Sequence, residues 1–372
     1  MTGKPTIKDV AELAGCGIAT VSRVLNNSGP TSLEKRQQVE EAVEALGFQF
    51  NEMGRSLKSN QSKAIAVLVP TLTNPVFADA IEGIQEAASE LGYEIILICS
   101  NYNADAELAG LKTLISRQVD GVILTVSDPH ESAALDLLRQ TSTPHCLIFN
   151  HSGDIQHSAV GVDNVAAARL VGDKMIELNH KKAAFVAVHF NSSDRSKARY
   201  DGFCAAFRDS GLREPGLIEV DYAPKDLEVS LSAVFRDDPD ISVLFASNDL
   251  LALSCIRALR ALGKRVPEDV SVVGFDGIAI ADLVEPNLAT VSTPCRAMGR
   301  TAAKLVISGL TGKSSDQNAP DQPGPEPTLI TLPFEFRSGN SLAPYRTKIA
   351  DERAATHPSA VATTPLNINQ TK

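Results

Sequence analysis

The segment TIKDVAELAGCGIATVSRVLN, residues 6–26, decides how this chain of 372 residues begins to fold. Thr6 is followed three residues later by Asp9, and this capping-box pattern predicts the start of a helix. Gly15 predicts the end of that helix, and a second helix is expected to open near Gly17. The segment therefore predicts two short helices joined by a tight turn.

A third helix is expected to complete this N-terminal platform. Thr31 and Glu34 repeat the capping-box pattern, and Gly47 predicts the stop. The second helix would then present small, polar and basic side chains, a shape that fits the DNA major groove. A helical bundle with no partner is the alternative, because helix-turn-helix packing is a common way to bury three short helices.

The strings DVAELAG, TVSRVLN, EALGF and RSLK resemble the headpiece of the lactose-repressor/galactose-repressor (LacI/GalR) family of bacterial transcription regulators. The resemblance continues to about Ser341. It implies that Arg23 contacts a guanine edge, whereas a solvated surface arginine is the alternative. Ile18 and Ala19 have no side-chain donor, so they would contribute shape and thymine-methyl contacts. The DNA-binding residues implied for the headpiece are Thr6, Ile18, Ala19, Thr20, Ser22, Arg23 and Asn26.

Residues 51–60, NEMGRSLKSN, resemble the family's hinge helix. So short a helix is unstable alone, because nucleation is costly, and we expect it to order when paired with its dimer mate on DNA. Leu57 matches the leucine that wedges into the minor groove, with Arg55 and Lys58 beside it. An ordinary linker residue is the alternative for Leu57.

From residue 64 onward, short apolar runs alternate with amphipathic helical stretches, in two successive series. This alternation predicts an α/β fold with parallel sheets covered on both faces, and two lobes with a ligand site in the cleft between them. The expected strands are 64–69, 94–99, 121–126 and 145–149 in the first series, and 183–188, 216–220, 242–247 and 271–275 in the second.

The resemblance implies a two-lobed core like that of periplasmic sugar-binding proteins, in which the chain crosses between lobes near Val162, Thr290 and Thr328. The expected organisation is a helix-turn-helix domain (1–50), a hinge (51–62), a core (63–341) and a disordered tail without periodicity (342–372). Within the core, lobe 1 takes about 63–162 and 291–328, and lobe 2 takes about 163–290 and 329–341.

Several polar residues follow the expected strands and match family cleft positions. Arg199 with Gly202 has the R-x-x-G spacing of the family's effector-binding arginine, and Asp276 would face it. A structural ion pair is the alternative for these two, and a capped helix start for Asn74. The implied effector-binding residues are Asn74, Phe77, Ser127, Arg199, Asn248 and Asp276. PTLTNPVFA and STPCRAMGR look most like gluconate-type repressors, which favours a sugar acid among sugars, sugar acids and sugar phosphates.

Composition restricts the remaining function classes. The net charge is −10, and in residues 1–62 seven Lys and Arg balance seven Asp and Glu, so DNA binding must depend on local placement of cations. Six scattered cysteines without a CxxC pair, and the lack of a signal segment or membrane-length apolar run, favour a cytoplasmic protein. The histidines at 145, 151 and 157 lack a metal-ligand pattern and are expected at the surface.

The sequence therefore predicts a homodimeric transcription regulator, a repressor, that binds near-palindromic double-stranded operator DNA under control of a small-molecule effector. It predicts no membrane contact, cofactor or metal. A transport-type sugar-binding protein is the alternative, and it would carry a secretion signal in place of the helix-turn-helix. An enzyme would need convergent acid–base or nucleophilic groups, and no such motif is found.

Overall fold

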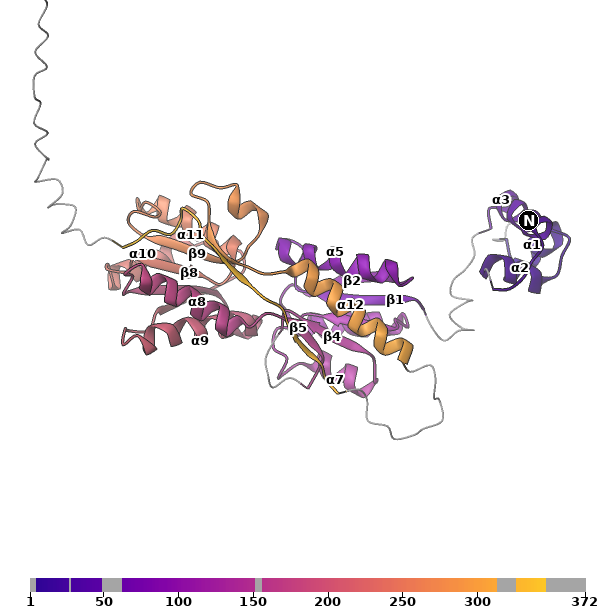
Figure 1. Cartoon of the computed structure of the whole chain (residues 1–372), viewed down its shortest axis with the longest axis horizontal. Coiled ribbons are helices and arrows are strands. Elements are labelled where there is room, and N and C mark those ends of the chain that lie inside the picture. Colours follow the sequence, from indigo (N-terminus) through magenta and orange to yellow (C-terminus); the bar gives the residue numbers. More distant parts are fainter. Residues whose placement is uncertain (1–4, 27, 49–61, 151–155, 313–325, 346–372) are drawn as a thin grey trace, which may run out of the picture. The chain divides into compact units, whose positions relative to one another are not determined.

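The computed structural model describes residues 5–26, 28–48, 62–150, 156–312 and 326–345. The chain divides into two compact units, Met1–Ser62 and Lys63–Lys372 (Figure 1). The hinge residues Arg55, Leu57 and Lys58, and the tail beyond residue 345, lie outside the described residues, so the predictions for them stay predictions.

The N-terminal unit is a three-helix headpiece of α1 (Ile7–Leu13), α2 (Ile18–Asn26) and α3 (Leu33–Leu46). The Thr6 backbone N–H donates to the Asp9 carboxylate over 2.7 Å, which confirms the expected start of α1. Gly15 and Gly47 have φ of +55° and +58°, the left-handed conformation that ends α1 and α3. The buried centre of the bundle is Val10, Ala11, Ala14, Val21, Val24, Val39 and Ala42.

The predicted cap of the third helix is wrong by one residue. Ser32 is the N-cap of α3, and its hydroxyl accepts from the Lys35 backbone N–H at 3.3 Å. The Thr31 hydroxyl instead donates to the Gly29 carbonyl. Threonine and serine are both favoured N-cap residues, and Ser32 caps α3 although only Thr31 has a glutamate three residues later.

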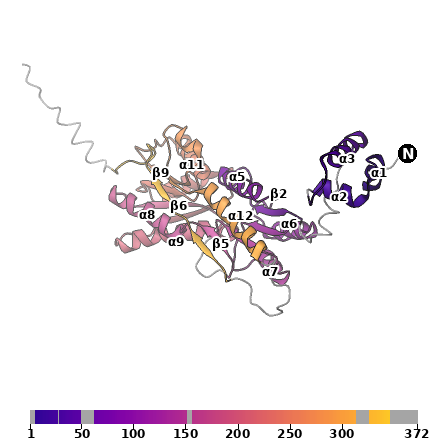
Figure 2. The ribbon, with the colours of Figure 1, turned by 45° about the vertical axis from the view of Figure 1, so that its right-hand side comes forward.

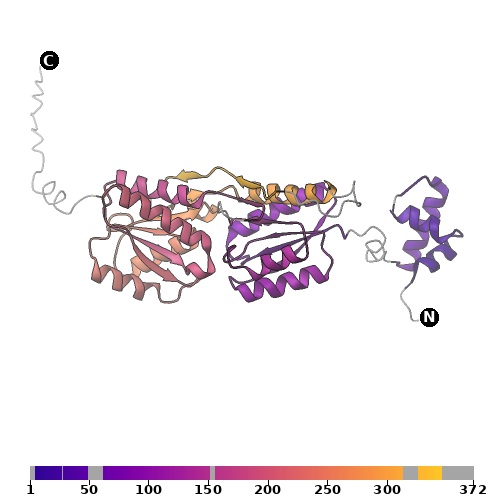
Figure 3. The ribbon, with the colours of Figure 1, turned by 90° about the horizontal axis from the view of Figure 1, so that it is seen from below.

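The second unit contains two sheets of six strands, each with helices on both faces (Figure 3). Sheet A has the strand order β11-β5-β4-β3-β1-β2, and sheet B has the order β12-β10-β9-β8-β6-β7. All pairings are parallel except β12 with β10. The strands of sheet A are β1 (Ala64–Val69), β2 (Glu94–Cys99), β3 (Gly121–Leu124), β4 (His145–Ile148), β5 (Ala159–Gly161) and β11 (Leu329–Thr331). Those of sheet B are β6 (Ala183–Val188), β7 (Gly216–Val220), β8 (Val243–Ala246), β9 (Ser271–Asp276), β10 (Ala289–Ser292) and β12 (Glu335–Arg337).

Both faces of the sheets are buried, which explains the unbroken apolar runs of the sequence. In β1, Ile65 and Val67 belong to one apolar cluster while Ala66 and Leu68 belong to another. The helices of lobe 1 are α5 (Pro75–Glu90), α6 (Ala104–Ser116), α7 (Ala133–Gln140) and α12 (Cys295–Gly312). Those of lobe 2 are α8 (Asn164–Glu177), α9 (Asp194–Asp209), α10 (Leu227–Asp237) and α11 (Asp249–Ala261), with short 3-10 turns η1 (Phe190–Ser192) and η2 (Ala279–Asp282).

Three connections join the lobes, as expected, but two of them lie later in the chain than predicted. Thr290 is inside β10 and pairs with Gly274, so the second crossing falls at residues 293–294. Leu329 pairs with Ala159 in sheet A, so the third falls at residues 332–334. Strands of three or four residues carry too little pattern to show which sheet they join.

The helices α5 and α12 lie side by side on one face of sheet A (Figures 1 and 2). A Cβ on Gly83 would lie 2.0 Å from the Arg296 carbonyl oxygen, and one on Gly299 would lie 1.9 Å from that of Ala80. The two glycines therefore permit a backbone-to-backbone crossing that no larger residue allows.

Two further predictions are corrected. Residues 342–345 are not part of a disordered tail: the Ala343 carbonyl accepts from His180 Nε2 over 3.0 Å, and the Tyr345 N–H donates to Leu178. His157 is buried and not at the surface, and its Nδ1 lies 2.7 Å from His145 Nε2. Burial lowers the pKa of His157 to about 4.

Candidate DNA-binding face and effector cleft

The exposed face of α2 carries the predicted base-reading residues. Ile18 is 45% exposed, and Ala19 and Arg23 are also exposed, whereas Val21 and Val24 are buried. The 3.6-residue helical period thus separates a core side from an outer side. The remaining predicted residues are Thr6, which is exposed, and Thr20, Ser22 and Asn26, which are half-buried.

Arg23 lies along α2. Its Nε donates to the Ala19 carbonyl at 3.3 Å, and its other guanidinium nitrogens donate to none of the described residues. Asn26 Nδ2 donates to the Ser22 carbonyl at 2.7 Å. These local bonds hold the side chains against α2, and the two terminal nitrogens of Arg23 stay available for a bidentate contact.

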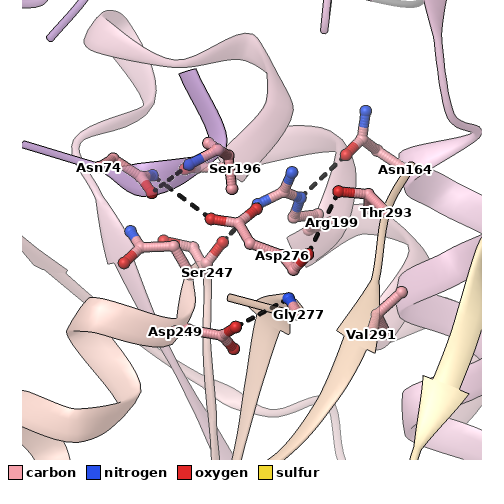
Figure 4. Close-up of polar contacts among 12 residues, drawn as sticks. Asn74, Asn164, Ser196, Arg199, Ser247, Asp249, Asp276, Gly277, Val291 and Thr293 are labelled. Carbon is pink, nitrogen blue, oxygen red and sulfur yellow. Dashed lines mark hydrogen bonds and ion pairs between the residues drawn. The ribbon is translucent and has the colours of Figure 1, made fainter. Parts of the chain in front are cut away.

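A second site forms where the strands of both sheets end. Parallel strands bring their carboxyl ends to one edge, where the following helices begin. Asn74, the N-cap of α5 in lobe 1, faces lobe 2, and its Nδ2 donates to Asp276 Oδ2 over 3.3 Å (Figure 4). The residues that line this cleft are Asn74, Val76, Phe77, Tyr102, Phe149, Val188, Ser193, Arg195, Ser196, Arg199, Ser247, Asn248 and Asp276.

The cleft contains five of the six predicted effector residues. Ser127 is not among its lining residues: its hydroxyl donates to Glu107 Oε1 at 2.7 Å, and its carbonyl accepts from the Asp194 N–H. Phe77 packs edge-on against Phe149, with ring centroids 5.1 Å apart. These rings give the lobe 1 side of the cleft an apolar wall.

Arg199 is buried at the floor of the cleft. Its Nη1 lies 3.7 Å from Asp276 Oδ1, its Nε donates to Asn164 Oδ1 at 2.8 Å, and its guanidinium stacks 3.5 Å from the Phe275 ring centroid. Burial lowers its pKa to about 10, so it stays charged at neutral pH. Burial also raises the pKa of Asp276 to about 6, against the opposing effect of Arg199. Figure 4 shows these groups converging.

The turn after β9 holds Asp276 in an unusual backbone conformation. Asp276 has φ of +119°, and Gly277 has φ of +75° with its missing Cβ only 2.5 Å from Ser292 Cα. A side chain at 277 would collide with that backbone, so this turn requires glycine at position 277. Asp249 stabilises the turn, since its Oδ2 accepts from the N–H groups of Gly277 and Ile278 at 2.8 and 2.9 Å.

Asp249 should make the stability of the protein depend on pH. Burial, together with the nearby charge of Asp276, raises the pKa of Asp249 to about 7. The folded state therefore binds this proton more tightly than the unfolded state, so the stabilisation is complete below about pH 4 and is lost as pH rises through 7. In Asp249→Asn the amide oxygen can still accept both N–H groups. We expect the melting temperature of this variant to fall less between pH 4 and 7 than that of the wild type.

The matched control for this measurement is Asp209→Asn, which removes an exposed carboxylate paired with Arg169 at 2.7 Å. Its melting temperature should follow the wild-type pH profile. An Asp249→Asn profile as steep as that of the wild type would contradict the assignment.

Sequence reasoning missed several residues of the cleft, and Arg195 is the most important of them. It lies one helical turn before Arg199 on α9, and this i, i+4 spacing was the signal that could have found it. Tyr102 and Phe149 follow the ends of β2 and β4, so their position after a strand was the signal that could have found them. Among the described residues, no group of three or more His, Cys, Asp or Glu side chains could hold a metal ion. No described helix is long and apolar enough to span a membrane.

Comparison with known proteins agrees with this two-part arrangement. Residues 6–51 match the family model "Bacterial regulatory proteins, lacI family", and residues 62–336 match "Periplasmic binding proteins and sugar binding domain of LacI family". The chain is 31% identical to the HTH-type transcriptional regulator CelR of Thermobifida fusca, over 84% of this chain and 94% of that protein. It is 29% identical to the HTH-type transcriptional regulator GntR of Escherichia coli (strain K12), over 91% of this chain and 99% of that protein.

Solved structures show the same fold. The lac repressor dimer bound to operator and the anti-inducer ONPF has a TM-score of 0.78 at 22% identity, over 92% of this chain and all of that one. A complex of the transcriptional regulator CelR with cellobiose has a TM-score of 0.66 at 27% identity, over 91% and 99% of the two chains.

Proposed function

Because the chain belongs to the LacI family of bacterial regulatory proteins, we propose that it is a cytoplasmic, homodimeric repressor of transcription. Two headpieces would bind the half-sites of a near-palindromic operator, and a small molecule in the cleft of each core would change the affinity for that DNA. The observation that supports this most directly is the exposed α2 face carrying Ile18, Ala19 and Arg23 above a buried bundle.

The proposed DNA contacts follow from the chemistry of that face. Arg23 reads a guanine edge, Ile18 and Ala19 contact apolar base edges, and the hydroxyl and amide groups bind phosphates. The hinge residues Arg55, Leu57 and Lys58 are proposed to act in the minor groove at the operator centre. The residues nearer the phosphates are Thr6, Thr20, Ser22 and Asn26.

The proposed effector is a sugar, a sugar acid or a sugar phosphate bound by Asn74, Phe77, Arg199, Asn248 and Asp276. A buried arginine facing an aspartate, beside an aromatic wall, suits a polyhydroxylated molecule with a polar edge and an apolar face. The resemblance of residues 70–78 and 292–300 to gluconate-type repressors favours a sugar acid. We propose no catalytic role for any cleft residue, since the family is one of regulators.

Effector binding is proposed to move the lobes. The cleft encloses only about 40 Å³, enough for a few water molecules of about 10–15 Å³ each. A sugar must therefore part the contact between Asn74 and Asp276 before it can enter. The coupling free energy between effector binding and operator binding is expected to be about 1–3 kcal/mol, or five- to 150-fold in operator affinity.

Replacing Arg23 tests the proposed DNA contact. We expect Arg23→Ala to weaken binding to the protein's own operator by about 1–3 kcal/mol, because a bidentate base contact is lost while the helix stays folded. Footprinting and mobility-shift titration on the DNA upstream of its own coding sequence, with and without sugars and sugar acids, would measure this.

Lys8→Ala is the charge-matched control, since it removes one exposed cation from α1. It should cause a much smaller loss that is the same for all DNA sequences. A wild-type protein that footprints no sequence under any metabolite condition would contradict the proposed function, as would an unchanged footprint with Arg23→Ala.

A further inference from the structure

Arg195 is a buried cation with hydrogen-bond donors to spare. It is 6% exposed, it lies in the first turn of α9, and it lines the cleft. Its Nη1 donates to the Val126 carbonyl at 3.1 Å and to Asp194 Oδ1 at 2.9 Å. Its Nε and Nη2 donate to none of the described residues. These two nitrogens are therefore the donors that Arg195 can offer to a molecule bound in the cleft.

The other polar groups of the cleft add donors to those of Arg195. Asn248 is buried, and its Oδ1 accepts from the Leu251 N–H at 2.9 Å to cap α11. The amide orientation is thereby fixed, and its Nδ2 is the end without a partner among the described residues. Arg199 Nη2 also has no described partner. The amino ends of α9 and α11, which begin at the cleft, favour negative charge as well.

The carboxylates near the cleft, by contrast, already have partners. Asp194 Oδ1 accepts from Asn150 Nδ2 at 2.8 Å as well as from Arg195. Asp249 accepts two backbone N–H groups and the Thr290 hydroxyl. Asp276 is engaged by Asn74 and Arg199. Donor nitrogens of Arg195, Arg199 and Asn248 therefore remain without described partners, whereas the carboxylates near the cleft are already engaged.

Three carboxyl groups lie near the cleft and would repel an anionic ligand if all of them were fully ionised. Burial raises the pKa of all three carboxyl groups, that of Asp276 to about 6 and that of Asp249 to about 7, so Asp249 carries only part of its negative charge near neutral pH. Arg199 stays charged under the same conditions, since its pKa remains about 10.

We infer that the effector of the proposed regulator carries a carboxylate or phosphate group, and that this group binds Nε and Nη2 of Arg195 in a bidentate contact. The inference rests on the proposed function and names the chemical class of its effector. A carboxylate or phosphate only accepts hydrogen bonds, and it matches the planar fork of a guanidinium. A neutral hydroxyl needs an acceptor for its own proton, and it forms no charge-assisted, bidentate pair with a guanidinium.

Matched ligand pairs test the inference on the full-length protein. The probes are D-glucose, D-gluconate and D-glucose 6-phosphate, with the corresponding sets for galactose and ribose, measured by thermal shift and then by calorimetry. We expect at least one anion to raise the melting temperature while its neutral parent does not. Comparison of the acid with the phosphate identifies which of the two groups Arg195 binds.

Arg195→Gln should weaken binding of that anion roughly 10- to 150-fold, the range for losing charged hydrogen bonds in a buried site. Lys197→Gln is the control, because it removes an exposed cation of the same helix that pairs with Asp201, and it should leave the affinity unchanged. Arg195→Gln leaves Asp194 without its cationic partner, although Asn150 still donates to it. The double variant Asp194→Asn/Arg195→Gln therefore removes both charges. It should fold and still fail to prefer the anion.

Three results would overturn the inference: neutral parents that stabilise as well as their anions, no stabilisation by any anion of the panel, or an unchanged anion response in Arg195→Gln. Operator footprinting keeps this inference distinct from the proposed function. A protein that footprints an operator and releases it with a neutral sugar keeps the proposed function and loses this inference. A protein that binds an anion through Arg195 but footprints no DNA keeps the anion site and loses the proposed function.

Discussion

Gly299→Ala is expected to destabilise the core more than any other single methyl addition to α12. The added Cβ would lie 1.9 Å from the Ala80 carbonyl oxygen and 2.9 Å from its carbon, and both are backbone atoms of α5. Neither helix can relieve this contact by rotating a side chain, so the two must separate along their whole crossing. Overpacking typically costs 1–3 kcal/mol, and we expect about 3 kcal/mol or more here because backbone must move.

The loss should also reach the effector site. Asn74 caps α5 at the cleft, and α12 begins at Cys295, two residues after Thr293, whose N–H donates to the Asp276 carbonyl at 3.1 Å. Separation of the two helices would therefore displace Asn74 relative to Asp276. Urea unfolding would measure the free-energy change, and calorimetry with the effector would measure the loss of binding.

Gly309→Ala on the same helix is the matched control. Nothing lies within 4 Å of the position of its Cβ, so the change should stabilise the protein by up to about 1 kcal/mol through helix propensity alone. If Gly299→Ala and Gly309→Ala unfold at the same urea concentration, the close helix crossing is not as described.

Arg199→Ala is expected to have the second large effect, on both stability and effector binding. It would leave Asp276, 8% exposed, without its cation in a buried site, and it would remove the stacking on Phe275. Breaking one partner of a buried ion pair costs about 3–5 kcal/mol. Chemical unfolding at pH 7 would measure the cost, which should shrink as pH falls below 6 because Asp276 takes up a proton.

A double variant separates the two roles of Arg199. Arg199→Met/Asp276→Asn removes both charges, so it should regain most of the lost stability, because buried ion pairs can be replaced by neutral groups at little cost. It should nevertheless bind no effector. Full effector binding by the double variant would show that the pair is structural only, the reading that competes with the proposed role.

The sequence was sufficient where local pattern decides structure. The helical period placed Val21 inside the headpiece and Arg23 outside it. Unbroken apolar runs gave four of the six described strands of each sheet to within two residues, but not the short strands β5, β10, β11 and β12. The family resemblance placed Asn74 and Asn248 at the cleft, and in the structure both line it and also cap the helices that follow. A side chain's position on its own helix or strand is fixed by backbone geometry, which the pattern of the sequence records.

The tertiary structure decided what depends on partners far apart in the chain. Ser127 precedes α9 by more than sixty residues, yet its hydroxyl is taken by Glu107, which removes it from the cleft. The buried state of His157 and the late crossings at residues 293–294 and 332–334 depend on strand pairing that no local pattern encodes. Arg195 could be placed on its helix from the sequence, but its spare donors follow from where Val126 and Asp194 lie in the folded chain. A hydrogen bond joins atoms about 3 Å apart in space, whereas periodicity describes only neighbours in sequence. Tertiary packing therefore decides which polar groups have a hydrogen-bond partner.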